Sequence, residues 1–203
     1  MKLRIILVAL TFALGGCSTL FPPSAPPSTD AVALARHLRS LENVAAFSLV
    51  GRMAVQTEKR GLSGAVRWKH TDEEDHILIF SPLGSQVADI RATPRGATLV
   101  TADKKTLQAD SPGALFYATT GMDLPLTGLT DWVLGRPATG TTHEIVAFDD
   151  RGRLIHLRQD GWDIEYDNYQ TVEGADLPGK VLLKSRELNF KLLIEQWGTL
   201  PRK

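Results

Sequence analysis

Residues 47–69 read FSLVGRMAVQTEKRGLSGAVRWK, and apolar and polar side chains alternate at both ends of this stretch. Phe47, Leu49, Met53 and Val55 share every second position of the first run, and the second run repeats the pattern up to Trp68. A period of two places the apolar side chains of a β-strand on one face. The stretch therefore predicts two half-buried strands joined by the polar residues between them.

The same pattern recurs along most of the chain and predicts a mainly β protein with about ten or eleven short strands. An antiparallel sheet with one apolar face explains such a series, and its strand number favours a large curved sheet or a barrel. A long loop is expected through Gly174 and Pro178. The further predicted strands cover residues 76–80, 86–92, 97–101, 105–109, 142–148, 153–158, 162–166, 180–185 and 188–194.

Three helices are expected beside this sheet. The first starts at Asp30, a good N-cap residue, and its apolar positions follow a helical period up to Ala45. The second begins at Ser111-Pro112 and ends at Gly121, and the third covers residues 129–134. With one apolar side each, these helices can cover the concave face of the sheet and enclose an apolar pocket for a greasy ligand.

The N-terminus indicates export and lipidation. Residues 1–16 combine positive charge with a short apolar run, which predicts a signal peptide rather than a membrane-spanning helix. Cys17, the only cysteine, follows Leu14-Gly15-Gly16 in the manner of a bacterial lipobox; the alternative is a chance cysteine after an ordinary signal peptide. Residues 17–29 form a Pro/Ser-rich tether, and residues 30–203 suit a single domain.

The segment ILIFSPLGSQVADI, residues 77–90, predicts a hairpin with a leucine at its turn. Ser81, Pro82 and Gly84 occupy the first, second and fourth positions that a type I turn favours. Turns lie at the surface, where an apolar side chain gains nothing from water. Leu83 therefore either folds back onto the core or meets an apolar partner outside the molecule.

The sequence offers no catalytic or metal-binding pattern. Its five histidines are scattered, residues 72–75 lack the spacing of a calcium loop, and no nucleophile motif or phosphate loop is present. Lys and Arg total 23, as do Asp and Glu, so no basic surface for nucleic acid is indicated. We expect neither an enzyme nor a protein that needs a metal or cofactor.

Several short motifs follow one another along the chain: the lipobox, FSLVGRMAV at 47–55, Trp68, PLG at 82–84, TGMDLP at 120–125, LTDWVLGRP at 129–137, QDGW at 159–162, Tyr166 and LP at 177–178. Their order resembles the LolB family of outer-membrane lipoprotein receptors, over essentially the whole mature chain. This resemblance implies an incomplete, unclosed antiparallel barrel with helices in and over its mouth. Ser18, rather than Asp, after the lipidated cysteine favours the outer membrane, by resemblance to enterobacterial-type lipoproteins.

The resemblance implies a monomer anchored by Cys17 to the periplasmic face of the outer membrane. It would accept lipoproteins from the soluble carrier LolA and place their acyl chains in the inner leaflet. Leu83, between Pro82 and Gly84, would contact or enter the membrane. No nucleotide or metal would be required.

The acyl-chain cavity is expected among the alternating apolar residues and the covering helices, although period two does not reveal which face holds cargo and each residue could be plain core. Two other binding roles remain open, an envelope stress sensor and a structural lipoprotein of an outer-membrane assembly complex. The candidate cavity residues are Leu49, Trp68, Leu78, Phe80, Leu99, Leu115, Phe116, Trp132, Ile164, Phe190 and Leu192.

Overall fold

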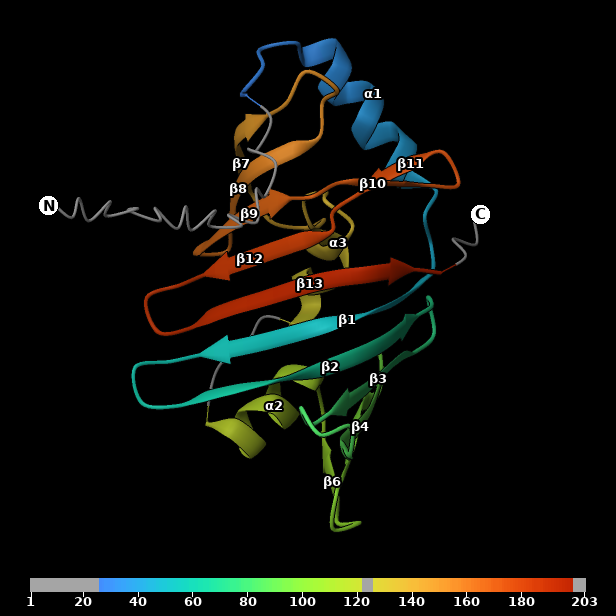
Figure 1. The fold of residues 1–203 in the computed structure, drawn as a ribbon, viewed down its shortest axis with the longest axis vertical. Coiled ribbons are helices and arrows are strands. Elements are labelled where there is room, and N and C mark those ends of the chain that lie inside the picture. Colours follow the sequence, from blue (N-terminus) through green and yellow to red (C-terminus); the bar gives the residue numbers. More distant parts are fainter. Residues whose placement is uncertain (1–25, 122–125, 199–203) are drawn as a thin grey trace, which may run out of the picture.

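An eleven-stranded antiparallel sheet dominates the computed structural model, which describes residues 26–121 and 126–198 (Figure 1). Its order is β6-β5-β4-β3-β2-β1-β13-β12-β9-β8-β7. The strands are β1 (Phe47–Gln56), β2 (Gly61–His70), β3 (Asp75–Phe80), β4 (Gln86–Thr93), β5 (Gly96–Thr101), β6 (Thr106–Ala109), β7 (His143–Phe148), β8 (Leu154–Gln159), β9 (Trp162–Asp167), β12 (Lys180–Lys184) and β13 (Asn189–Trp197).

The sheet remains open because β6 and β7, its two edges, do not pair with each other. The first six strands form a meander, and β13 returns to pair with β1 at the middle of the sheet. The N-terminal segment reaches the β7 edge, where the Ser28 N–H donates to the Phe148 carbonyl at 2.6 Å. The predicted mainly β fold with an unclosed antiparallel sheet is confirmed.

The three predicted helices are present as α1 (Ala31–Glu42), α2 (Pro112–Thr120) and α3 (Leu126–Val133). Asp30 caps α1 by accepting from the Val32 and Ala33 N–H groups. Ser111 caps α2, which packs against β5 and β6, whereas α1 lies against the far end of the sheet. Helix α1 ends before Ala45, and α3 begins three residues earlier than the sequence predicted.

A small hairpin replaces part of the predicted long loop. Strands β10 (Gln170–Val172) and β11 (Ala175–Leu177) pair with each other outside the main sheet. Their two-residue turn has positive φ at Glu173 (48°) and Gly174 (81°), the geometry of a type I′ turn. Three residues are too few for alternation to be recognised, but the Gly at the second turn position was a usable signal.

Trp132 of α3 is fully buried in the larger of the two core clusters. Its indole N–H donates to Oε1 of Gln159, which also accepts from the Ala138 N–H. Nε2 of Gln159 donates to the Ala138 carbonyl and to Oγ1 of Thr141. One buried amide therefore joins α3 and the segment after it to β8.

Replacing Gln159 with leucine is expected to lower the free energy of unfolding by about 3 kcal/mol or more, because buried donors and acceptors lose their partners. For a chain of this size the midpoint of thermal unfolding should fall by roughly 6–12 °C. The Trp132→Phe change should cost less in the Gln159→Leu background than in the wild type, because the indole donor is already unpaired there. Unchanged melting of Gln159→Leu would contradict this role of the amide.

Candidate binding cavity and hairpin tip

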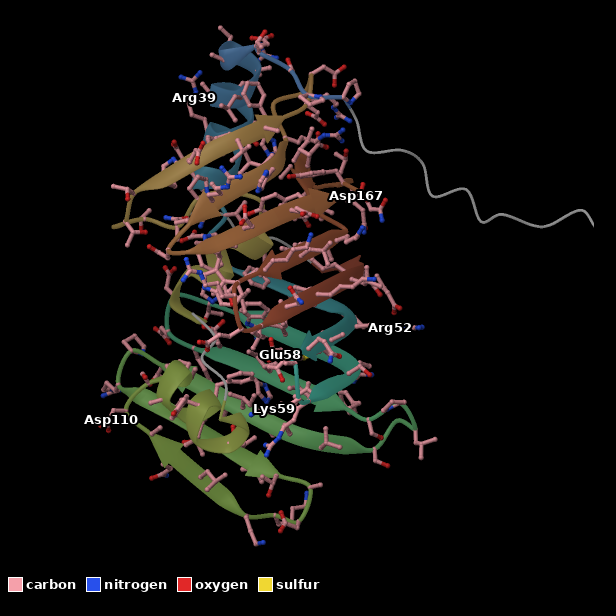
Figure 2. The ribbon with its side chains drawn as sticks, turned by 90° about the vertical axis from the view of Figure 1, so that its left-hand side faces the viewer. Arg39, Arg52, Glu58, Lys59, Asp110 and Asp167 are labelled. Atoms are coloured by element: carbon pink, nitrogen blue, oxygen red, sulfur yellow. The ribbon has the colours of Figure 1, made fainter. Side chains whose placement is uncertain are left out.

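An apolar cavity of about 100 Å³ lies between one half of the sheet and helices α2 and α3. It occupies the concave side, whereas Arg52 points away from the opposite side of the sheet (Figure 2). Its lining is almost entirely hydrocarbon, with Asp75 as the one charged residue. The lining residues are Met53, Val66, Trp68, Asp75, Ile77, Ile79, Ile90, Ala92, Leu99, Pro112, Leu115, Phe116, Thr119, Leu129, Phe190 and Leu192.

Strand register builds the sheet side of this cavity. Trp68, Ile77, Ile90 and Leu99 are paired directly across β2, β3, β4 and β5, so their side chains form one transverse row on the concave face. Side chains directly opposite each other on one face are in contact range. The row therefore gives the cavity a continuous apolar wall.

Helix α2 supplies the opposite wall. Leu115, Phe116 and Thr119 lie within one helical turn and face the sheet, and Leu129 of α3 joins them. Among the described side chains of α2, only Leu115 is buried. The helix thus covers the cavity with few buried contacts of its own.

Six of the eleven predicted cavity residues line this cavity and five do not. Those in place are Trp68, Leu99, Leu115, Phe116, Phe190 and Leu192. Leu49, Trp132 and Ile164 are instead buried in packed core, at 2%, 0% and 0% exposure. Periodicity identifies a face of the sheet, but whether a position is filled or hollow depends on what packs against it, and these three positions are filled.

Leu78 and Phe80 do not line this cavity either. Ile77 and Ile79 line the cavity, so the residues between and beyond them point to the convex side, where Phe80 lies under the Arg67 guanidinium at 5.2 Å from its ring centroid. The run from Ile77 to Phe80 is apolar throughout, which removes the alternation that would reveal its orientation.

Asp75 is a polar lining residue that the sequence reasoning missed as part of the cavity. Its Oδ1 accepts hydrogen bonds from the Trp68 indole N–H and from Nδ1 of His70, both at 2.7 Å. The carboxyl side chain is 25% exposed. Its place opposite His70 in the β2–β3 register brings the three side chains together.

Leu83 stands at the tip of the β3–β4 hairpin with 94% of its surface exposed. The Gly84 N–H donates to the Ser81 carbonyl at 2.9 Å, and Gly84 has φ +84°, as a type I turn followed by a left-handed residue requires. The next most exposed large apolar residue among those described is Val32, at 66%. The structure thus places Leu83 away from the core.

The predicted signal peptide, Cys17 and residues 17–25 of the predicted tether lie outside the described residues. Within residues 26–121 and 126–198, no helix has the length and apolar character needed to cross a membrane. The same part of the chain contains no group of three or more His, Cys, Asp or Glu residues arranged to hold a metal ion.

The open sheet with its helix-covered apolar cavity defines a half-barrel class of protein. Solved structures of this class include a LolA superfamily protein from Nitrosomonas europaea, with TM-score 0.50 and 12% identity over 84% of this chain and 94% of that one. A DUF1329 family protein from Desulfovibrio piger has TM-score 0.50 and 10% identity, covering 84% of this chain and 90% of the other. At these identities the likeness concerns the fold alone.

Sequence comparison identifies the family to which the chain belongs within this fold class. Residues 45–197 match the family described as outer membrane lipoprotein LolB, and the chain belongs to this family. An outer-membrane lipoprotein LolB from Thiobacillus denitrificans is 35% identical over 99% of this chain and its own full length. One from Nitrosococcus oceani is 34% identical, covering 97% of this chain and 96% of the relative.

Proposed function

We propose that the protein accepts the acyl chains of lipoproteins in the apolar cavity and delivers them to the inner leaflet of the outer membrane. The observation that carries this proposal is that strands β3 and β4 both line the hydrocarbon cavity and, at the turn that joins them, present the exposed Leu83. The cavity provides apolar surroundings for the chains, and the tip provides a contact with lipid. Family membership supports the same role.

The energetics require such a sheltered route. Burial of one methylene contributes about 0.8 kcal/mol, so three chains of roughly fifteen methylenes oppose transfer into water by on the order of 35 kcal/mol. The chains must therefore pass directly from one apolar site to another. We propose a LolA-type periplasmic carrier as the donor and the bilayer as the final acceptor, with each acceptor more favourable than the last.

Loading must enlarge the cavity. Its volume of about 100 Å³ is below the ~150 Å³ that accommodates one benzene molecule, so acyl chains need additional space. Helix α2 is the element suited to move, because only Leu115 among its described side chains is buried. In this proposal cargo displaces α2 from β5 and β6.

Leu83 contributes a weak membrane contact in this proposal. Full burial of one leucine contributes about 1.5–3 kcal/mol, which does not hold a protein on a bilayer. The lipid on Cys17 provides the anchor at the periplasmic face, while Leu83 disturbs the leaflet locally as cargo leaves. No chemical bond is made or broken in the transfer, and one copy of the chain suffices.

A transfer assay tests the function directly. The chain carrying Cys17→Ala, which lacks the proposed lipid, is incubated with a LolA-type carrier loaded with a triacylated lipoprotein. The lipoprotein is expected to leave the carrier and co-purify with this protein. Retention of all cargo on the carrier would contradict the proposal, and a sensor or a purely structural lipoprotein would give that result.

A further inference from the structure

We infer that the Asp75 carboxylate is a polar subsite of the cavity that binds an N–H donor on an acylated lipid. The inference rests on the proposed function, because it concerns a lipid seated in the same cavity. The two oxygens of this carboxylate differ in their hydrogen bonds. Trp68 and His70 both donate to Oδ1, and Oδ2 has no hydrogen bond to any described residue.

Satisfying the indole N–H of Trp68 does not by itself require a carboxylate. A neutral acceptor would serve, whereas an ionised carboxylate adds several lone-pair sites. The Asp75 side chain is 25% exposed, so water can donate to Oδ2, and an N–H group of a ligand in the cavity would replace that water. The two donors on Oδ1 fix the carboxyl group, and with it the position of Oδ2.

Acylated lipids carry donors that match this acceptor. The N-acyl amide of a triacylated cysteine has one N–H, which loses its bond to water when its chain enters hydrocarbon surroundings. The ammonium of a phosphatidylethanolamine headgroup also offers N–H donors and would form a charge-assisted bond. Both ligands present the same chemistry, an N–H group attached to acyl chains.

The position of Asp75 also fixes the direction of a bound chain. Asp75 is paired with His70 and Ala92, and the remaining sheet residues of the lining lie at that level or on the side of the β3–β4 turn. Asp75 therefore marks one end of the cavity, at the start of β3 (Figure 1). A chain attached there would run past Ile77 and Ile79 toward the end of β3, about 17 Å away, where the hairpin turn begins.

The Asp75→Asn change tests the subsite while keeping its geometry. The amide oxygen can still accept from Trp68 and His70, but the second position becomes a donor instead of an acceptor. Binding is measured on the chain with Cys17→Ala, through displacement of the fluorophore 1-aminoanthracene by dodecanamide and by methyl dodecanoate. The ratio of the amide affinity to the ester affinity is expected to fall about tenfold in Asp75→Asn.

A second pair of ligands separates the two sources of the donor. If the amide is the ligand group, lysophosphatidylethanolamine and lysophosphatidylcholine should show equal affinity ratios in both proteins; an ammonium ligand would lower that ratio in Asp75→Asn. An unchanged ratio in both pairs, or an equal loss of every ligand, would overturn the inference. Failure of the wild type to bind any of the four would instead reject the proposed function.

Discussion

Replacing Leu83 with glutamate is expected to reduce delivery of lipoprotein to membranes at least tenfold while leaving uptake from the carrier unchanged. Leu83 is 94% exposed, so the substitution removes no core packing. It removes about 1.5–3 kcal/mol of apolar transfer free energy and adds a charge that hydrocarbon disfavours. The measurement is the amount of lipoprotein that floats with liposomes after incubation with loaded protein.

A matched control shows whether the effect depends on the position of the substitution or only on the added charge. Val32 on α1 is the next most exposed large apolar residue described, and Val32→Glu introduces the same charge far from the hairpin. Delivery by Val32→Glu should equal that of the wild type, and Leu83→Phe should retain most delivery. Normal delivery by Leu83→Glu would exclude the proposed membrane contact.

A second carboxylate, placed in the middle of the cavity wall and away from the Asp75 end, should abolish acyl-chain binding. Ile79→Asp places a charge beside the hydrocarbon path, where an incoming chain would have to desolvate it. We expect at least a hundredfold weaker binding of a fluorescent fatty acid, measured by titration. Because Ile79 is only half-buried, the variant should keep its fold, which circular dichroism will verify.

Leu78→Asp is the control for this prediction, since the same change is made one residue away on the same strand. Leu78 is also half-buried but alternates with the two lining isoleucines and so faces the convex side. Its binding should stay close to that of the wild type. Equal losses in Ile79→Asp and Leu78→Asp would mean that the cavity is not the binding site.

The contrast between these two residues shows what sequence pattern can predict. In β1 and β2, polar residues such as Arg52, Arg67 and Lys69 separate apolar residues, and the predicted alternation matches the observed burial from Phe47 to Val55 and from Gly64 to Trp68. In β3 no polar residues separate the apolar ones, and the candidates Leu78 and Phe80 do not line the cavity. The transverse row from Trp68 to Leu99 could not be predicted, because register depends on turn geometry as well as on pattern.

The candidate site also has one part that the sequence predicts and one part that it does not. The hairpin turn could be predicted because Ser81, Pro82 and Gly84 have strong local preferences, and the structure excludes a Leu83 folded back onto the core. The hollow between α2 and the sheet could not, because it depends on where packing is incomplete. Asp75 could be recognised as a lining residue only from its three-dimensional position beside Trp68.

The hydrogen bond from Ser28 to Phe148 fixes where the N-terminal segment leaves the domain, at the β7 edge. Seven strand spacings separate β7 from β3, so the strand that leads to the hairpin tip lies at most about 34 Å away across the sheet. Eleven residues from Cys17 to Ser28 reach no more than ~40 Å. A lipid at Cys17 would then hold one end of the domain at the membrane, and the tilt of the domain about that point would determine when Leu83 reaches the bilayer.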